Sequence, residues 1–305
     1  MRDSAIGRLR GIPRGGTVLS SLEHFLRMGR SMTNRYRLIA IALGVLGHAN
    51  PRASLRAQTG DSARVDKTFL TRRDAVLTGV AIVGTVAVSA FDERIARWTQ
   101  TDQVQGGASR RKLFDDLTHL NETPLTIGAV LTYGIGRLVR SETVADVGLH
   151  WSEAIVLNNV VSELIRGPIG RARPRVSQDN AFKFEFGGGF TKFEDRSFPS
   201  LHSSSAFATA AALVGEIHER HPGAATWIAA PLLYGAATIP GVTRMYLDQH
   251  WASDVVSGAF VGTLIGAKVV HYAHTHRRTK LDRALLGTTI APVKGGVALA
   301  FSLQP

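Results

Sequence analysis

The chain has 305 residues, of which 44% are hydrophobic, and it contains no Cys, which excludes disulfides and thiolate metal sites. Its formal net charge of +12 is concentrated near the N-terminus, where residues 1–56 hold ten Arg, no Lys and only two acidic residues. A nucleic-acid-binding domain carries its basic residues on the folded part with aromatic residues among them, so we expect no nucleic-acid partner.

Residues 1–49 have the pattern of a leader. After Met32, a basic segment precedes the apolar residues 38–47, and the small-x-small triplet Gly47-His48-Ala49 follows. This order is typical of a signal peptide, and the alternative is a short core or interfacial segment. Residues 50–73 are polar and are predicted to be a linker.

Six apolar segments with helical character follow and predict an all-α domain over residues 74–285. They are residues 75–91, 124–139, 144–165, 200–217, 224–239 and 250–272. Asp74 is expected to cap the first of them. The tail, residues 286–305, alternates in polarity around Gly295-Gly296 and can form a short β-hairpin.

The sequence leaves membrane insertion open. A span needs about 20 apolar residues, whereas several of these segments are shorter or carry polar residues, and the mean hydropathy of +0.03 is low for a protein mostly embedded in lipid. One interpretation is a soluble or peripheral helical domain in the periplasm. The other is six short spans with basic residues on the inner side, as the positive-inside rule prefers. Membrane association is expected, and the oligomeric state is not predicted.

Residues 243–254 contain an Arg six residues before a His and an Asp four residues after it, namely Arg244, His250 and Asp254. A helix is expected to start near His250, so that residues i and i+4 share a face. The Asp254 carboxylate can then accept the proton of one imidazole nitrogen, and the other keeps the lone pair that a nucleophile needs. Arg244, expected in the loop before this helix, can bind an oxyanion. By itself this pattern also fits a surface loop followed by a core helix.

Two further motifs lie upstream. Residues 166–174 hold three Arg separated by Gly and Pro, an arrangement that can clamp a tetrahedral oxyanion but also fits a solvated basic loop. In residues 196–205, Ser200 is expected to be a helix N-cap, which places His202 in the first turn, where an anion is favoured. A His beside a bound phosphate can protonate a leaving oxygen. The alternative is a capping Ser with a solvent-facing His.

Together the three motifs resemble the type 2 phosphatidic acid phosphatase/haloperoxidase superfamily, whose pattern is Lys-x6-Arg-Pro, Pro-Ser-Gly-His and Ser-Arg-x5-His-x3-Asp. In this chain the pattern reads Arg166-x6-Arg173-Pro174, then Pro199-Ser200-Leu201-His202, then Thr243-Arg244-x5-His250-x3-Asp254. The resemblance implies an all-α six-helix bundle. It also implies roles for eight residues: His250 as the nucleophile, Asp254 as its orienting partner, His202 as the general acid, and Arg166, Arg173, Ser200, Leu201 and Arg244 as phosphate-binding residues.

Three positions depart from the family pattern. Arg166 replaces Lys, which keeps the charge but changes its geometry. Thr243 replaces Ser, a mild change. Leu201 replaces Gly, and if this position requires a positive φ, the Leu costs about 1–2 kcal/mol. Its side chain can also narrow the entrance to the phosphate site.

The resemblance implies a metal-independent phosphatase, without a cofactor, that hydrolyses phosphomonoesters or pyrophosphates through a phospho-His intermediate. The expected substrate is a phosphorylated lipid or a small organic phosphate, and the expected location is the bacterial cell envelope with the site facing the periplasm. Two alternatives keep the site but change its use: a vanadate-dependent haloperoxidase, and a non-catalytic protein that binds phosphate or lipid headgroups and has degenerated at Leu201.

Overall fold

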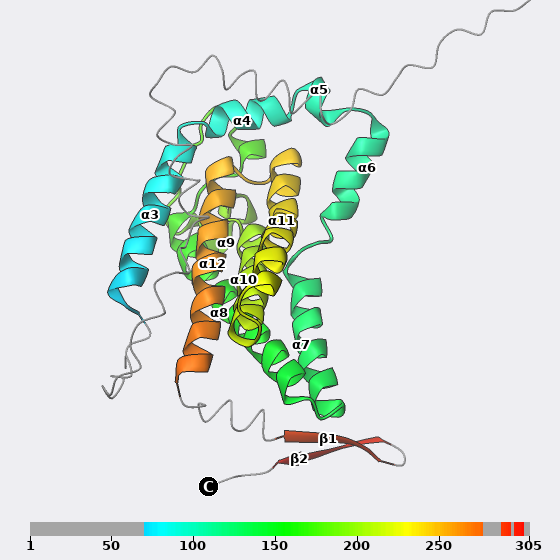
Figure 1. The fold of residues 1–305 in the computed structure, drawn as a ribbon. Coiled ribbons are helices and arrows are strands. Elements are labelled where there is room, and N and C mark those ends of the chain that lie inside the picture. Colours follow the sequence, from blue (N-terminus) through cyan, green and yellow to red (C-terminus); the bar gives the residue numbers. More distant parts are fainter. Residues whose placement is uncertain (1–69, 277–287, 294–295, 302–305) are drawn as a thin grey trace, which may run out of the picture. The chain divides into compact units, whose positions relative to one another are not determined.

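Six long helices make up most of the computed structural model, which describes residues 70–276, 288–293 and 296–301 (Figure 1). They are α3 (Arg72–Ser89), α7 (Glu122–Leu138), α8 (Glu142–Ile169), α10 (Leu201–Arg220), α11 (Ala224–Tyr246) and α12 (Ala252–Thr275). Each of the six predicted helices is found, so the all-α prediction is confirmed. The predicted leader and most of the predicted linker lie outside the described residues.

Short elements occupy the connections and the tail. They are α4 (Asp92–Thr99), α5 (Asp102–Gln105), α6 (Ala108–Leu117), η3 (Pro174–Val176), α9 (Gly188–Thr191) and η4 (Phe193–Asp195). In the tail, β1 (Thr288–Val293) pairs antiparallel with β2 (Gly296–Phe301), with Thr288 opposite Phe301. The hairpin expected there is therefore present.

The first helix begins differently from the prediction, which placed Asp74 at the N-cap. Thr71 is the N-cap, and its hydroxyl accepts a hydrogen bond from the Asp74 N–H at 3.3 Å. The Asp74 carboxylate in turn accepts the Thr71 N–H at 2.7 Å. This reciprocal capping box satisfies two N–H groups that the first helical turn cannot pair internally, so Asp74 belongs at the third helical position.

Three helix ends near the sequence motifs also differ from the prediction. α8 continues to Ile169 and ends at Gly170, which adopts φ 59°, so Arg166 lies in its last turn rather than after the helix. α11 continues through Pro240 to Tyr246, which places Arg244 in its last turn instead of a loop. α12 starts at Ala252, two residues later than expected, because the Asp254 carboxylate accepts the Trp251 N–H and thereby caps the helix there.

The packing of α10 on α12 depends on small residues. A Cβ atom added to Gly262 would come closer to the Ser204 carbonyl oxygen than any real Cβ does, and Gly258 and Gly266 meet the backbone of α10 in the same way. Rows of small residues let two helix backbones approach this closely, as in many membrane proteins. The contact fixes the start of α10, with its motif, against the start of α12.

Large apolar side chains are exposed on the outer faces of four helices, whereas many buried residues are Ser, Ala and Gly. The exposed side chains include Val76, Ile82, Val83, Val86, Ile127, Val130, Leu131, Ile135, Val156, Val160, Leu164, Trp227, Ile228 and Leu232. By length and composition α11 and α12 can each cross a membrane, and α3 with α4, bent by 58°, forms a third candidate. The described residues thus have the features of a membrane protein, and the polar, small-residue interior explains the low mean hydropathy.

Candidate active site

A pocket of 260 Å³ lies where the last turns of α8 and α11 meet the starts of α10 and α12. Six of the eight residues that the motifs single out line this one pocket: Arg166, Arg173, Leu201, His202, Arg244 and His250. The other two, Ser200 and Asp254, are fully buried. Segments separated by up to about ninety positions therefore converge, as the sequence predicts.

Arg166 and Arg173 come from the first motif and are 6% and 2% exposed. Arg166 donates to the Pro199 carbonyl at 3.0 Å and to Glu163 at 3.2 Å. Arg173 donates to the Gln249 side chain at 2.8 Å and its guanidinium lies 4.2 Å from the centre of the Phe193 ring. These contacts hold both guanidinium groups against the pocket wall.

The second motif forms the start of α10. The Ser200 hydroxyl caps the helix by accepting the Ser203 N–H at 3.4 Å, as predicted. Leu201 is the first helical residue, and among the described non-glycine residues only Arg140 and Asp248 have positive φ. The backbone strain considered for Leu in place of the family Gly therefore does not arise, and Leu201 instead narrows the pocket by lining it.

Arg244 and His250 come from the third motif. Arg244 donates to the Thr118 hydroxyl at 3.2 Å. Buried nitrogens of four pocket residues have no hydrogen-bond partner in the described part of the chain: Nε of Arg166, Nε of Arg244, Nδ1 of His202, and both ring nitrogens of His250. Because a buried donor without a partner costs about 1–3 kcal/mol, this many in one pocket are typical of a site that binds a polar ligand.

Asp254 lies beside His250, but the two groups are not within hydrogen-bonding distance. The Nδ1 atom of His250 is 3.6 Å from Oδ2 of Asp254. The carboxylate instead accepts hydrogen bonds from Arg171 at 2.6 Å, Ser197 at 2.5 Å and the Trp251 N–H at 2.9 Å. Nδ1 faces this carboxylate, so Nε2 is the nitrogen left for chemistry.

Arg171, which the motif pattern passes over, belongs to the support of Asp254 rather than to the pocket. Its guanidinium also donates to Asp92 at 2.8 Å and to Ser253 at 2.8 Å. Asp92 in turn accepts the Ser253 N–H at 2.8 Å. The buried guanidinium of Arg171 is thus paired with the carboxylates of Asp92 and Asp254, and any one of these three charges would be costly to bury alone.

Four further residues line the pocket that sequence reasoning missed: Glu122, Glu163, Phe193 and Arg196. Glu163 pairs with both Arg166 and Arg196. Its position three residues before Arg166 on one helix face was a signal that could have found it. Glu122 gave no such signal, because it begins α7, far from all three motifs.

Burial and the nearby positive charges lower the pKa values of the two imidazoles. Burial, with the guanidinium groups of Arg173 and Arg166, lowers the pKa of His250 to about 4 despite the neighbouring Asp254. Burial, then Arg244 and His250, lowers the pKa of His202 to about 2. Both rings are therefore neutral near pH 7 before an anion binds, and the pocket carries the net positive charge of its arginines.

Comparisons with known proteins find a family and several relatives that resemble this chain. The model of the PAP2 superfamily matches residues 148–278. A lipid A 1-phosphatase of Rhizobium etli is 30% identical over 123 residues, 39% of this chain and 47% of that protein. A lipid A 4'-phosphatase of Bacteroides thetaiotaomicron is 28% identical over 144 residues, 45% of this chain and 56% of that protein. The chain thus spans about half the length of these curated relatives.

Among solved structures, a transmembrane PAP2-type phosphatidylglycerolphosphate phosphatase from Bacillus subtilis has the same fold. It aligns with a TM-score of 0.53 at 18% sequence identity and covers 69% of this chain and 100% of that chain. The matched family region contains all three motifs and the ends of α8, α10, α11 and α12 that meet at the pocket. Residues 148–278 of this chain are thus similar in sequence to the PAP2 superfamily, and the fold is that of a PAP2-type phosphatase.

Proposed function

We propose that the chain is a membrane-associated phosphoric monoester hydrolase that acts on a phosphorylated lipid through a phospho-His intermediate. The observation that carries the proposal is the convergence of three guanidinium groups and two imidazoles on one buried pocket, with several of their nitrogens unpaired within the described chain. Such a pocket complements a tetrahedral phosphate and the trigonal transition state of its transfer.

In the proposed first step, the lone pair on Nε2 of His250 attacks phosphorus while the bond to the ester oxygen breaks. His202, protonated in the complex, gives its proton to the leaving oxygen. Arg166, Arg173 and Arg244 bind the equatorial oxygens, together with the N–H groups at the start of α10. In the second step, water attacks phosphorus, His202 accepts its proton, and the bond from phosphorus to Nε2 breaks to release inorganic phosphate.

Asp254 stabilises the imidazolium that forms in this reaction. Its present separation of 3.6 Å from Nδ1 of His250 must shorten as the ring gains positive charge. Catalytic hydrogen bonds are often long in the free protein and tighten in the complex. The three donors to the carboxylate keep it in place for this role.

His202 gains its proton with the substrate. Its pKa of about 2 in the free pocket results from burial and from nearby positive charge. A phosphomonoester dianion offsets that charge, so binding raises the pKa of His202 and favours the protonated acid. Because His250 must stay neutral while His202 is protonated in the complex, the rate is expected to be bell-shaped in pH.

A lipid substrate is favoured by the residues around the pocket. Phe193 lines it, and Phe182, Phe186 and Phe190 in the same connection between α8 and α10 are each at least 60% exposed. Aromatic side chains of this kind partition to membrane interfaces. Several curated relatives are named lipid A phosphatases, which supports a phosphorylated glycolipid or glycerolipid as the substrate class.

We further propose that the pocket faces the periplasm. Arg72 and Arg73 start α3, and Arg137 lies in the last turn of α7. The opposite end of α7 carries Glu122, which lines the pocket, and the chain after α3 carries Asp92, which accepts a hydrogen bond from Arg171 beneath the site. The positive-inside rule places the basic ends on the cytoplasmic side.

The test is phosphate release by the purified full-length chain in detergent, from p-nitrophenyl phosphate and from lipid phosphates. We expect turnover to fall by more than about 1,000-fold in His250→Ala. His218→Ala, which removes an exposed His of α10, serves as the matched control and should leave the rate unchanged. Binding of phosphate without turnover by the unaltered chain would contradict the proposal and favour a non-catalytic binding protein.

A further inference from the structure

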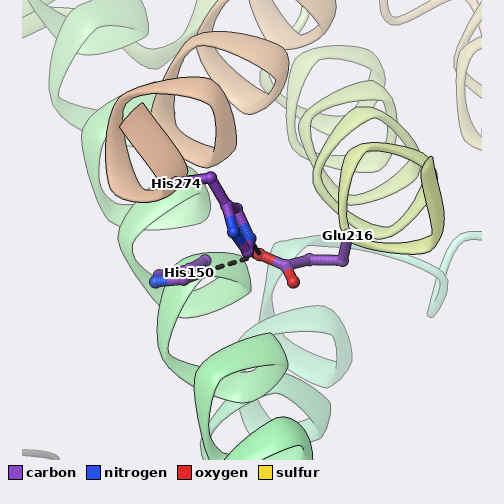
Figure 2. A group of neighbouring side chains, drawn as sticks. All are labelled: His150, Glu216 and His274. Carbon is purple, nitrogen blue, oxygen red and sulfur yellow. Dashed lines mark hydrogen bonds and ion pairs between the residues drawn. The ribbon is translucent and has the colours of Figure 1, made fainter. Parts of the chain in front are cut away.

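A second group of titratable side chains, two buried and one exposed, lies between helices of the bundle, away from the pocket. Figure 2 shows His150 from α8, Glu216 from α10 and His274 from α12 meeting at one point. Nδ1 of His150 is 2.5 Å from Oε1 of Glu216, and Nε2 of His274 is 3.1 Å from the same oxygen. One ligand atom from each of the three residues lies within 4.8 Å of the others.

The group joins three of the four helices that build the pocket, α8, α10 and α12, away from the ends that carry the motifs. Glu216 lies fourteen residues after His202 on α10, and His150 lies sixteen residues before Arg166 on α8. At 1.5 Å per residue these separations are about 21 and 24 Å. The phosphate chemistry proposed for the pocket therefore makes no use of His150, Glu216 or His274.

The surroundings hold the carboxylate in a fixed orientation. Oε2 of Glu216 pairs with Arg220, one turn further along α10, and Arg220 lies 3.7 Å from Asp146 of α8. Glu216 is 2% exposed and His150 7%. A ligand carboxylate whose second oxygen is held by an outer partner is a recurrent feature of metal centres.

We propose that His150, Glu216 and His274 bind a transition-metal ion, with Zn²⁺ as the expected species. Two imidazole nitrogens and one carboxylate oxygen are a common three-ligand set for zinc, which leaves a fourth position for water. Ligand bonds of about 2.0–2.2 Å put neighbouring ligand atoms about 3.3 Å apart in a tetrahedron. The present atoms reach that arrangement by side-chain rotation, as the two ring nitrogens release their contacts to the shared oxygen and bind the ion.

The role of the ion would be structural. Three ligands from three helices tie α8, α10 and α12 together at the end remote from the pocket, where no motif residue fixes their spacing. A ligand that binds the folded chain alone raises its stability in proportion to the logarithm of its concentration. Metal removal should therefore lower thermal stability without removing the catalytic groups.

The test uses the full-length chain in detergent after treatment with a chelator and dialysis. We expect it to bind about one Co²⁺ per chain, with the visible absorption of a four-coordinate ion, and about one Zn²⁺ that displaces it. Zn²⁺ should raise the midpoint of thermal unfolding by about 5 °C. Turnover of p-nitrophenyl phosphate at 25 °C should be the same with and without the metal.

Variants separate the proposed site from incidental binding. His274→Ala removes a ligand whose side chain is 25% exposed, so the variant should fold and yet bind Zn²⁺ more than about 100-fold more weakly. His150→Ala should show the same loss. His218→Ala, an exposed His two residues after Glu216, should bind as the unaltered chain does. A folded, unaltered chain that binds neither ion at micromolar concentration overturns the proposal, as does full binding by His274→Ala.

Discussion

Glu122 faces the proposed acid of the reaction across the pocket. Its Oε2 atom is 4.0 Å from Nε2 of His202 and has no hydrogen-bond partner elsewhere in the described chain. At this distance a carboxylate favours the protonated imidazole, opposing the arginines that disfavour it. We therefore expect Glu122 to act on catalysis through His202, as a positioning residue rather than a group that touches phosphorus.

Glu122→Gln is expected to move the alkaline limb of the pH–rate profile to lower pH by roughly one unit, because the neighbouring negative charge no longer raises the pKa of His202 in the complex. KM should fall, since a charge that repels phosphate is removed. The dependence of the rate on p-nitrophenyl phosphate concentration, measured across pH, gives both kcat and KM. Glu219→Gln, an exposed position on α10, is the control, and an unmoved limb in Glu122→Gln would exclude this role.

At the residue scale, the residues that meet in the pocket were predictable because each motif is short and its members lie at or beside a helix end. The buried network that supports Asp254 was not. Asp92 comes from 162 positions earlier in the chain and contacts Arg171 and Ser253 only after α4 has folded against the start of α12. Nothing in the local sequence around Asp92 indicates that contact. The sequence also assigned Asp254 to His250 alone, whereas three other donors hold it.

At the scale of elements, the close contact between α10 and α12 at Gly258, Gly262 and Gly266 sets the distance between the imidazoles of His202 and His250. The helix identities were predictable from apolar runs, but the ends were not, since Pro240 lies inside α11 where proline usually ends a helix. The outcome matters for the site, because the extra turns of α8 and α11 carry Arg166 and Arg244 to the pocket.

Gly262→Val is expected to lower the midpoint of thermal unfolding and to reduce kcat/KM at least about tenfold. The added side chain meets the Ser204 carbonyl and pushes α10 away from α12, and overpacking of this kind costs about 1–3 kcal/mol. Gly79→Val on α3 makes the same change where a Cβ meets nothing within 4 Å of the described chain. Equal effects of the two substitutions would mean that the close contact between α10 and α12 has no special role.

At the scale of the whole molecule, the apolar outer faces and the polar interior explain why the low mean hydropathy did not exclude membrane association. The mean hydropathy of a sequence does not distinguish outward-facing residues from interior ones. A chain with lipid-facing helices and a Ser-rich core therefore has the mean hydropathy of a soluble protein. Of the exposed phenylalanines in the connection between α8 and α10, Phe193 lines the pocket.

Replacing both Phe182 and Phe186 by Ser should reduce kcat/KM for a lipid phosphate by about tenfold while leaving p-nitrophenyl phosphate unaffected. Each ring contributes apolar area to the contact with a membrane or a lipid chain, and tenfold corresponds to partial burial of the two rings. Phosphate release from mixed micelles measures the ratio. Trp227→Ser removes an exposed aromatic ring at the far end of α11 and should not change it. A parallel loss on both substrates would point to a folding defect.

The row that runs from Asp254 through Gly258 and Gly262 to Gly266 advances in steps of four residues along α12. The same helical spacing therefore positions both the carboxylate beside His250 and the glycines that pack α12 against α10. A single-residue insertion after Asp254 would rotate everything beyond it by about 100° and shift it by about 1.5 Å, so no local repair could restore both. Insertions or deletions within the first four turns of α12 should therefore abolish activity, whereas the connection between α10 and α11 should tolerate a tag or a fusion.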